Sequence, residues 1–430
     1  MSRLAALTAL LLGVTLLAGR LSLSQPQRTF TASRDHPAIE YSSRPTSDAV
    51  AALNRQIQKG EVELELSGTG GYLESVLAAL DISIESQVLV FSETSFQPER
   101  ITKSNPRALY FNDTVAVGWV PGSDLVEVAA LDPAQGVVFY ALDQKTQEKP
   151  QFARDQQCLL CHMSSFTSGV PGLLTMSVLP LSDDPNEYVQ GWGVDHRTPI
   201  ADRWGGWYVT GQQVPARHLG NVPVYHVERS YVREPAAPKL ESVAGEFDTT
   251  PFLSEHSDVV ALMVLNHQVE MTNRIIRLAW EARIAAQDAP PAQTGEVPAR
   301  VREAAQELVD YLLFVDEAPL PSKVQGSSAF AREFTAKGPR DSHGRSLRDL
   351  DLERRLLRYP CSYMIYTDAF DAIPGAAKAA VYERMWEILS GEENNPAYAR
   401  LSRGDRQAIV EILRDTKKDL PDYFQPARIG

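Results

Sequence analysis

The chain has 430 residues and a formal net charge of −13 at pH 7, with 43% hydrophobic and 23% charged residues. This composition is ordinary for a globular protein and allows a sizeable core. The acidic excess argues against binding to nucleic acid or to anionic lipid, and it favours a basic partner protein or a small soluble substrate.

The first 24 residues have the features of a secretory signal peptide. Arg3 precedes an uncharged apolar stretch over residues 4–18, and small residues at 22–24 suit a signal peptidase. We expect cleavage near Ser24, which removes Arg3 and Arg20 and leaves a net charge of −15. A retained membrane anchor is the alternative, although the apolar run is shorter than the ~20 residues that span a bilayer. Residues 25–45 are polar and predict an extended linker.

Short β-branched and aromatic runs alternate with turn signals across residues 46–150, which predicts an antiparallel β-rich region. Between the first two runs, apolar residues at helical spacing predict a short helix over 72–80. The expected strands cover residues 62–66, 87–91, 108–111, 114–120, 125–131 and 137–142.

Residues 158–162 read Cys-Leu-Leu-Cys-His and form the most specific motif in the chain. Two thiols three residues apart on one helical turn can both face a porphyrin edge and add to its two vinyl groups, and His162 then falls under the iron. In this run and in its export signal the chain resembles the c-type cytochromes, in particular large single-haem periplasmic proteins with a cytochrome c domain. The resemblance implies thioether bonds from Cys158 and Cys161 to one haem c and an axial bond from His162 to its iron.

A thiol redox pair, a zinc site and a disulfide are the alternative interpretations of this motif. A thioredoxin-like redox pair would follow an apolar strand, whereas residues 151–157 are polar. A zinc site would need further ligands, and no second C-x-x-C or H-x₃-H supplies them. A disulfide between two cysteines so spaced on a helix is sterically poor. Cys361, in an apolar and aromatic setting, is expected to be a buried, inert thiol.

The segment 151–245 is expected to be an irregular haem-binding region, because it is rich in Gly, Pro and Trp and shows little periodicity. Arg203 or Arg197 could pair with a haem propionate, and Trp207 or Trp204 could pack on the porphyrin. The alternative is a Gly-Trp structural corner with surface arginines.

From residue 246 to 430 the pattern becomes mostly helical. The expected helices cover residues 255–286, 298–314, 346–357, 375–389 and 402–415, where apolar residues recur at steps of three and four. We expect this region to pack on the haem region. The fold class is therefore α+β, with a β-rich N-terminal part, an irregular middle and a helical C-terminal part.

The function depends on the sixth iron position, because a closed iron transfers electrons and an open one can bind a small ligand. His267 lies on an apolar stripe and is the first candidate for the distal axial ligand, with a hydrogen-bonded core histidine as the alternative. His218 and His196 are the next candidates for this ligand. Met176 is a weaker candidate, because it lies closer to the motif than the methionine ligand of small c-type cytochromes usually does. The leading hypothesis is a periplasmic single-haem electron-transfer protein. The alternatives are a haem enzyme with an open iron that acts on peroxide or another small substrate, and a thiol redox protein without haem.

Overall fold

An antiparallel sheet of six strands forms the N-terminal half of the protein, and the C-terminal half is mostly helical. The computed structural model describes residues 30–93, 95, 97–178, 191–221, 237–288 and 297–425. The predicted α+β class is confirmed. The expected signal peptide lies outside the described residues, and no helix among those described is long and apolar enough to cross a membrane.

The sheet is a meander in which each strand pairs with the next one along the chain. Five of the predicted strands are confirmed, but residues 62–66 form no strand, because alternate glutamates there face solvent and no neighbouring strand pairs with them. β7 and β8 form a separate two-stranded antiparallel sheet. The strands are β1 (Val88–Val90), β2 (Arg107–Phe111), β3 (Val115–Trp119), β4 (Leu125–Asp132), β5 (Gly136–Asp143), β6 (Ala153–Arg154), β7 (Met176–Val178) and β8 (Gly191–Gly193).

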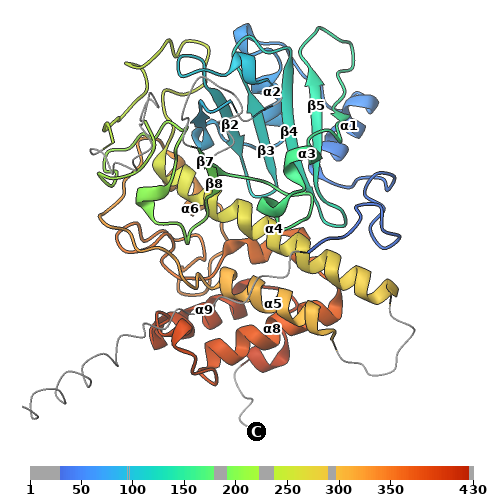
Figure 1. Cartoon of the computed structure of the whole chain (residues 1–430), viewed down its shortest axis with the longest axis vertical. Coiled ribbons are helices and arrows are strands. Elements are labelled where there is room, and N and C mark those ends of the chain that lie inside the picture. Colours follow the sequence, from blue (N-terminus) through green and yellow to red (C-terminus); the bar gives the residue numbers. More distant parts are fainter. Residues whose placement is uncertain are drawn as a thin grey trace, which may run out of the picture.

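The two faces of the sheet have different neighbours, since successive side chains of a strand point to opposite faces. Helices α1 (Ala49–Lys59) and α2 (Leu73–Ala79) cover one face, and the short helix α3 (Leu159–His162) lies over the other, in front of β4 and β5 in Figure 1. Tyr140 donates a hydrogen bond of 2.7 Å to Asp48, which caps α1. Its neighbour Phe139 points to the opposite face and contacts α3.

Residues 30–45 do not form the extended linker that their polarity predicts. Backbone hydrogen bonds fold this segment into successive turns. Ile39 and Tyr41 are buried, and the Tyr41 hydroxyl donates to the carbonyl of Val137 at 2.8 Å. A few apolar side chains in a polar segment are therefore enough to attach it to the sheet.

Four of the five helices predicted for the C-terminal half are confirmed, and the short helices at 330–336 and 368–371 were not predicted. Residues 346–357 form turns rather than a helix. Here Asp349 accepts from the backbone N–H of Ser346, and Asp351 accepts from those of Glu353 and Arg354, so the side chains compete with helical hydrogen bonds. The helices are α4 (Val259–Asp288), α5 (Ala299–Leu312), α6 (Phe330–Ala336), α7 (Asp368–Asp371), α8 (Gly375–Ser390) and α9 (Arg403–Thr416).

Helix α4 lies between the sheet and the helices α5, α8 and α9 (Figure 1). Of its 30 residues, 23 are buried, and Glu270, Arg274 and Arg277 form a partly exposed stripe. Gln268 donates to the carbonyl of Asn112 in the β2–β3 turn at 2.6 Å and accepts from the Tyr363 hydroxyl at 2.9 Å. Trp280 donates to the carbonyl of Gln135 in the β4–β5 turn. The two halves of the molecule thus share one core.

Replacing Gln268 with Ala should destabilise the protein by about 2 to 4 kcal/mol, because the buried carbonyl of Asn112 and the hydroxyl of Tyr363 both lose their partner. Tyr363→Phe removes only the hydroxyl and should cost about 1 kcal/mol. Urea unfolding measures both values. Equal losses in the two variants would mean that the bond to the β2–β3 turn contributes nothing.

Candidate functional site

The Cys-Leu-Leu-Cys-His motif forms one helical turn at α3. The backbone N–H of His162 donates to the carbonyl of Cys158 at 2.9 Å, so these two side chains project from the same side of the turn. Cys158 is half-buried and Cys161 is exposed, and both are free thiols. Leu160, between them, is 79% exposed.

The imidazole of His162 is held in one tautomer. Its Nδ1 lies 3.0 Å from the carbonyl oxygen of Gly172, and because a carbonyl can only accept, Nδ1 carries the proton. Nε2 therefore carries the lone pair, and no described residue hydrogen-bonds to it. The ring packs on Phe139 with the centroids 4.7 Å apart. Burial lowers the pKa of His162 to about 4, so the imidazole is neutral at neutral pH, the form that binds metal ions.

The chain after the motif turns back on His162. The buried Thr167 donates to the carbonyl of Val170 at 2.8 Å, and Gly169 takes the left-handed φ of 75° that this turn requires. The backbone N–H of Gly172 then donates to the carbonyl of His162 at 2.9 Å. Gly172 thus bonds both the backbone and the ring of His162.

The thiol of Cys158 is poorly suited to redox exchange. Burial, followed by the charges of Asp155 and Glu127, raises its pKa to about 12. A reactive thiol needs the opposite shift, because the thiolate is the nucleophile. The described residues also contain no group of three or more His, Cys, Asp or Glu side chains that could hold a metal ion. The geometry therefore favours neither the thiol redox interpretation nor the zinc interpretation.

The sheet face beside α3 carries small residues. Next to Phe139, the register brings together the partly exposed Ala116, Ala129 and Ala141 and the buried Gly118, from β3, β4 and β5. Arg107 of β2 lies across Gly118 and forms an ion pair of 2.5 Å with Glu127, while its Nε is buried without a hydrogen-bond partner. Sequence reasoning missed this surface, and the run of small residues in alternate strand positions was its only signal.

Arg203 and Trp207, the two residues predicted to contact the cofactor outside the motif, bond to the backbone instead. Arg203 is 2% exposed and donates to the carbonyls of Thr198 and His196. Trp207 donates to the carbonyl of Met176 at 2.8 Å. Neither hydrogen-bonds to residues 158–162. These contacts are those of a structural corner, but with a buried arginine rather than a surface one.

Arg197 and Trp204 are engaged in similar ways. Arg197 donates to the carbonyl of Val315 at 3.0 Å. The indole of Trp204 donates to the side-chain oxygen of Asn266 at 3.0 Å. Both side chains therefore join the middle segment to other parts of the core.

His267 uses both of its ring nitrogens within the core. Nδ1 lies 2.8 Å from Nδ1 of His196, and Nε2 lies 2.7 Å from the hydroxyl of Ser362. Burial lowers its pKa to about 3. Binding iron would cost one of these hydrogen bonds, so the arrangement matches the core-histidine alternative. His218, a further candidate for the distal axial ligand, accepts at Nδ1 from the backbone N–H of Gly220 at 3.0 Å.

A cavity of about 150 Å³ adjoins the segment that follows the motif. Its walls come from this segment, from the end of β8 and the residues after it, and from α4. Leu173 and Phe166 are apolar members of the lining, and Asp195 and Glu270 are the acidic ones. Burial raises the pKa of the Glu270 carboxyl.

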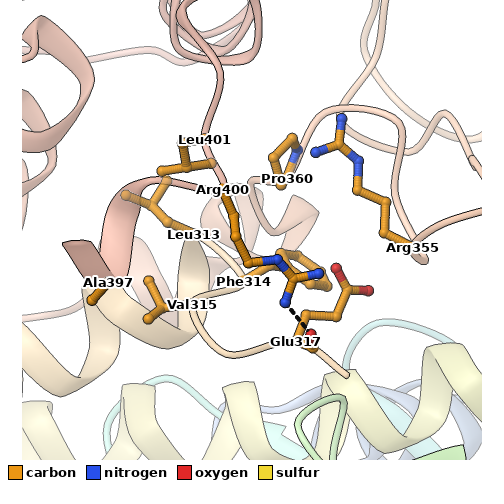
Figure 2. Close-up of a pocket in the computed structure, with 9 residues that line it drawn as sticks. All are labelled: Leu313, Phe314, Val315, Glu317, Arg355, Pro360, Ala397, Arg400 and Leu401. Atoms are coloured by element: carbon orange, nitrogen blue, oxygen red, sulfur yellow. Dashed lines mark hydrogen bonds between the residues drawn. The ribbon is translucent and has the colours of Figure 1, made fainter. Parts of the chain in front are cut away.

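A second cavity, of about 30 Å³, lies among the C-terminal segments (Figure 2). Glu317 points into it, and Arg400 donates to the Glu317 backbone carbonyl. One Glu317 carboxylate oxygen accepts from the backbone N–H of Leu356 at 2.8 Å. Burial raises the pKa of this carboxyl to about 7.

Comparison with known proteins gives no match: no family model, curated protein or solved structure matches the chain.

The raised pKa of Glu317 predicts a pH-dependent stability. Between pH ~4.3, where a carboxyl of the unfolded chain titrates, and about 7, the folded protein holds a proton that the unfolded chain has lost. The free energy of unfolding therefore falls as the pH rises through this window. Glu317→Gln cannot ionise, so its stability relative to wild type should increase by roughly 2 to 3 kcal/mol from pH 5 to 8. Urea unfolding across this range measures the difference, with Glu353→Gln, at an exposed position, as control. A difference that stays constant with pH would contradict the prediction.

Proposed function

We propose that the protein carries one covalently attached haem c and transfers electrons outside the cytoplasm. Cys158 and Cys161 form the thioether bonds, and His162 is the proximal axial ligand. One observation carries the proposal: the Gly172 carbonyl fixes the proton on Nδ1 of His162, which leaves Nε2 for iron on the same helical turn as two free thiols.

The surroundings of α3 support a bound planar group. The alanines of β3, β4 and β5 beside Phe139 are partly exposed, and the buried Nε of Arg107 lacks a partner. Phe166, four residues after His162, is 46% exposed, although a large aromatic side chain gains free energy from burial. The haem supplies a one-electron iron couple, and the protein holds it in place and sets its surroundings.

A second function has support from His267, the first candidate for the distal ligand. Both of its ring nitrogens are used in hydrogen bonds within the core. This favours an iron whose sixth position is open to a small ligand, as in the alternative of a haem enzyme acting on peroxide or another small substrate. Electron transfer remains the first proposal, because it requires only the bound haem and no catalytic acid or base.

The proposed location and partner rest on charge and on the signal-like N-terminus. Haem c attachment in bacteria takes place after export, which fits a periplasmic protein. The net charge of −13 favours a basic redox partner.

The purified protein, produced with a haem c attachment system, should give a haem c pyridine haemochrome spectrum with one haem per chain. Cys158→Ala combined with Cys161→Ala should lose the covalent haem, because no thioether bond can form. Cys361→Ala, which changes the buried cysteine outside the motif, is the matched control and should keep it. A wild-type protein without covalent haem would refute the proposal.

Carbon monoxide distinguishes an open iron from a closed one. If His267 stays in its hydrogen bonds to His196 and Ser362, carbon monoxide should bind the reduced protein rapidly, and His267→Ala should leave the visible spectrum unchanged. Stopped-flow absorbance measures the binding rate. Slow binding that becomes fast in His267→Ala would instead make His267 the distal ligand.

A further inference from the structure

The segment Pro171-Gly172-Leu173 is held on two sides as well as by His162. Toward the sheet, the carbonyl of Pro171 accepts from the backbone N–H of Val137 at 3.0 Å. Toward α4, Leu173 bonds to the side chain of Asn273, which lies 100 residues further along the chain. Gly172, the hydrogen-bond partner of His162, lies between these two attachments.

The carboxamide of Asn273 forms a two-point clamp on Leu173. Its oxygen accepts from the Leu173 N–H at 2.9 Å, and its nitrogen donates to the Leu173 carbonyl at 2.9 Å. Because one partner only donates and the other only accepts, both amide atoms have a defined role. Asn273 is 1% exposed, so water cannot readily replace either bond.

Asn273 also touches Gly172 directly. A Cβ placed on Gly172 would collide with the side-chain oxygen of Asn273. The φ of Gly172 is not in the left-handed region, so the close approach of this amide, rather than backbone conformation, is what requires glycine there. The amide thus fixes the position of the peptide whose carbonyl bonds His162.

We propose that Asn273 is a positioning residue for the proximal histidine, an inference that rests on the proposed haem function. By fixing the Gly172 carbonyl, Asn273 keeps Nδ1 of His162 hydrogen-bonded. That bond increases the basicity of the imidazole and stabilises oxidised iron. Loss of the clamp therefore loosens the bond and raises the midpoint potential of the haem.

The decisive comparison is between Asn273→Ala and Gln268→Ala. Both residues lie on α4 and are at most 3% exposed, and each side-chain amide makes two hydrogen bonds. Only Asn273 bonds to the segment 171–173 that follows the motif. We expect both variants to lose stability. Only Asn273→Ala should raise the midpoint potential and lower the iron–histidine stretching frequency of the reduced, five-coordinate protein.

Equal potentials and frequencies in the two variants would overturn the proposal. If Asn273→Ala does not fold, Gly172→Ala takes its place, because the added methyl group displaces the same peptide while leaving Asn273 intact; an unchanged potential in that variant would also overturn it.

A wild-type chain without covalent haem refutes the proposed function but still allows the clamp to be tested. In that case ¹⁵N NMR of the His162 ring, assigned with His162→Gln, should detect the Nδ1–H tautomer in wild type and a tautomer mixture in Asn273→Ala. An unchanged tautomer would overturn the clamp.

Discussion

The burial of helix α4 is the constraint on which the rest of the structure depends. A helix with 23 of its 30 residues buried cannot shift without disturbing its neighbours, because protein interiors are close-packed. Its polar side chains are used for attachment: Gln268 joins the β2–β3 turn to Tyr363, and Trp280 bonds to the β4–β5 turn. The sheet and the C-terminal helices are therefore fixed relative to each other through one element. For this reason the two halves are better described as layers of one core than as independent domains.

The candidate site uses this rigidity. The motif helix α3 is short and lies over the sheet, so on its own it would not hold His162 in one orientation. The segment 171–173 supplies the missing support, since it is bonded to β5 on one side and to Asn273 of α4 on the other. The ring of His162 is thus aligned by elements that lie far apart in the sequence. A precise axial ligand requires such outer support, because the metal bond alone does not set the orientation of the ring.

Much of the fold can be predicted from local sequence patterns, and where these predictions fail the cause is also local. Strands β4 and β5 are β-branched and aromatic runs between turn signals, and helices α5, α8 and α9 have apolar residues at steps of three and four. The structure has all five where these patterns predict. The segment 346–357 carries the same period, but Asp349 and Asp351 capture backbone N–H groups and replace the helix with turns. The motif at 158–162 is visible in the sequence because its residues are adjacent. The contact of Asn273 with Leu173 is not, because nothing local marks residues 100 positions apart as partners.

The choice of a distal ligand illustrates the limit of periodicity. The apolar stripe through His267 correctly indicates a buried residue, but in a helix with 23 of its 30 residues buried most stripes face a core. His267 and Asn273 are six positions apart on α4, which places them about 120° apart around the helix axis. Asn273 bonds to Leu173 in the segment that follows the motif, whereas His267 bonds to Ser362 in the C-terminal half and to His196. A histidine on that side of α4 can stabilise the core without approaching the iron. The chemistry of the proposed haem then depends on what reaches the face opposite His162, and the covalent motif alone does not determine that.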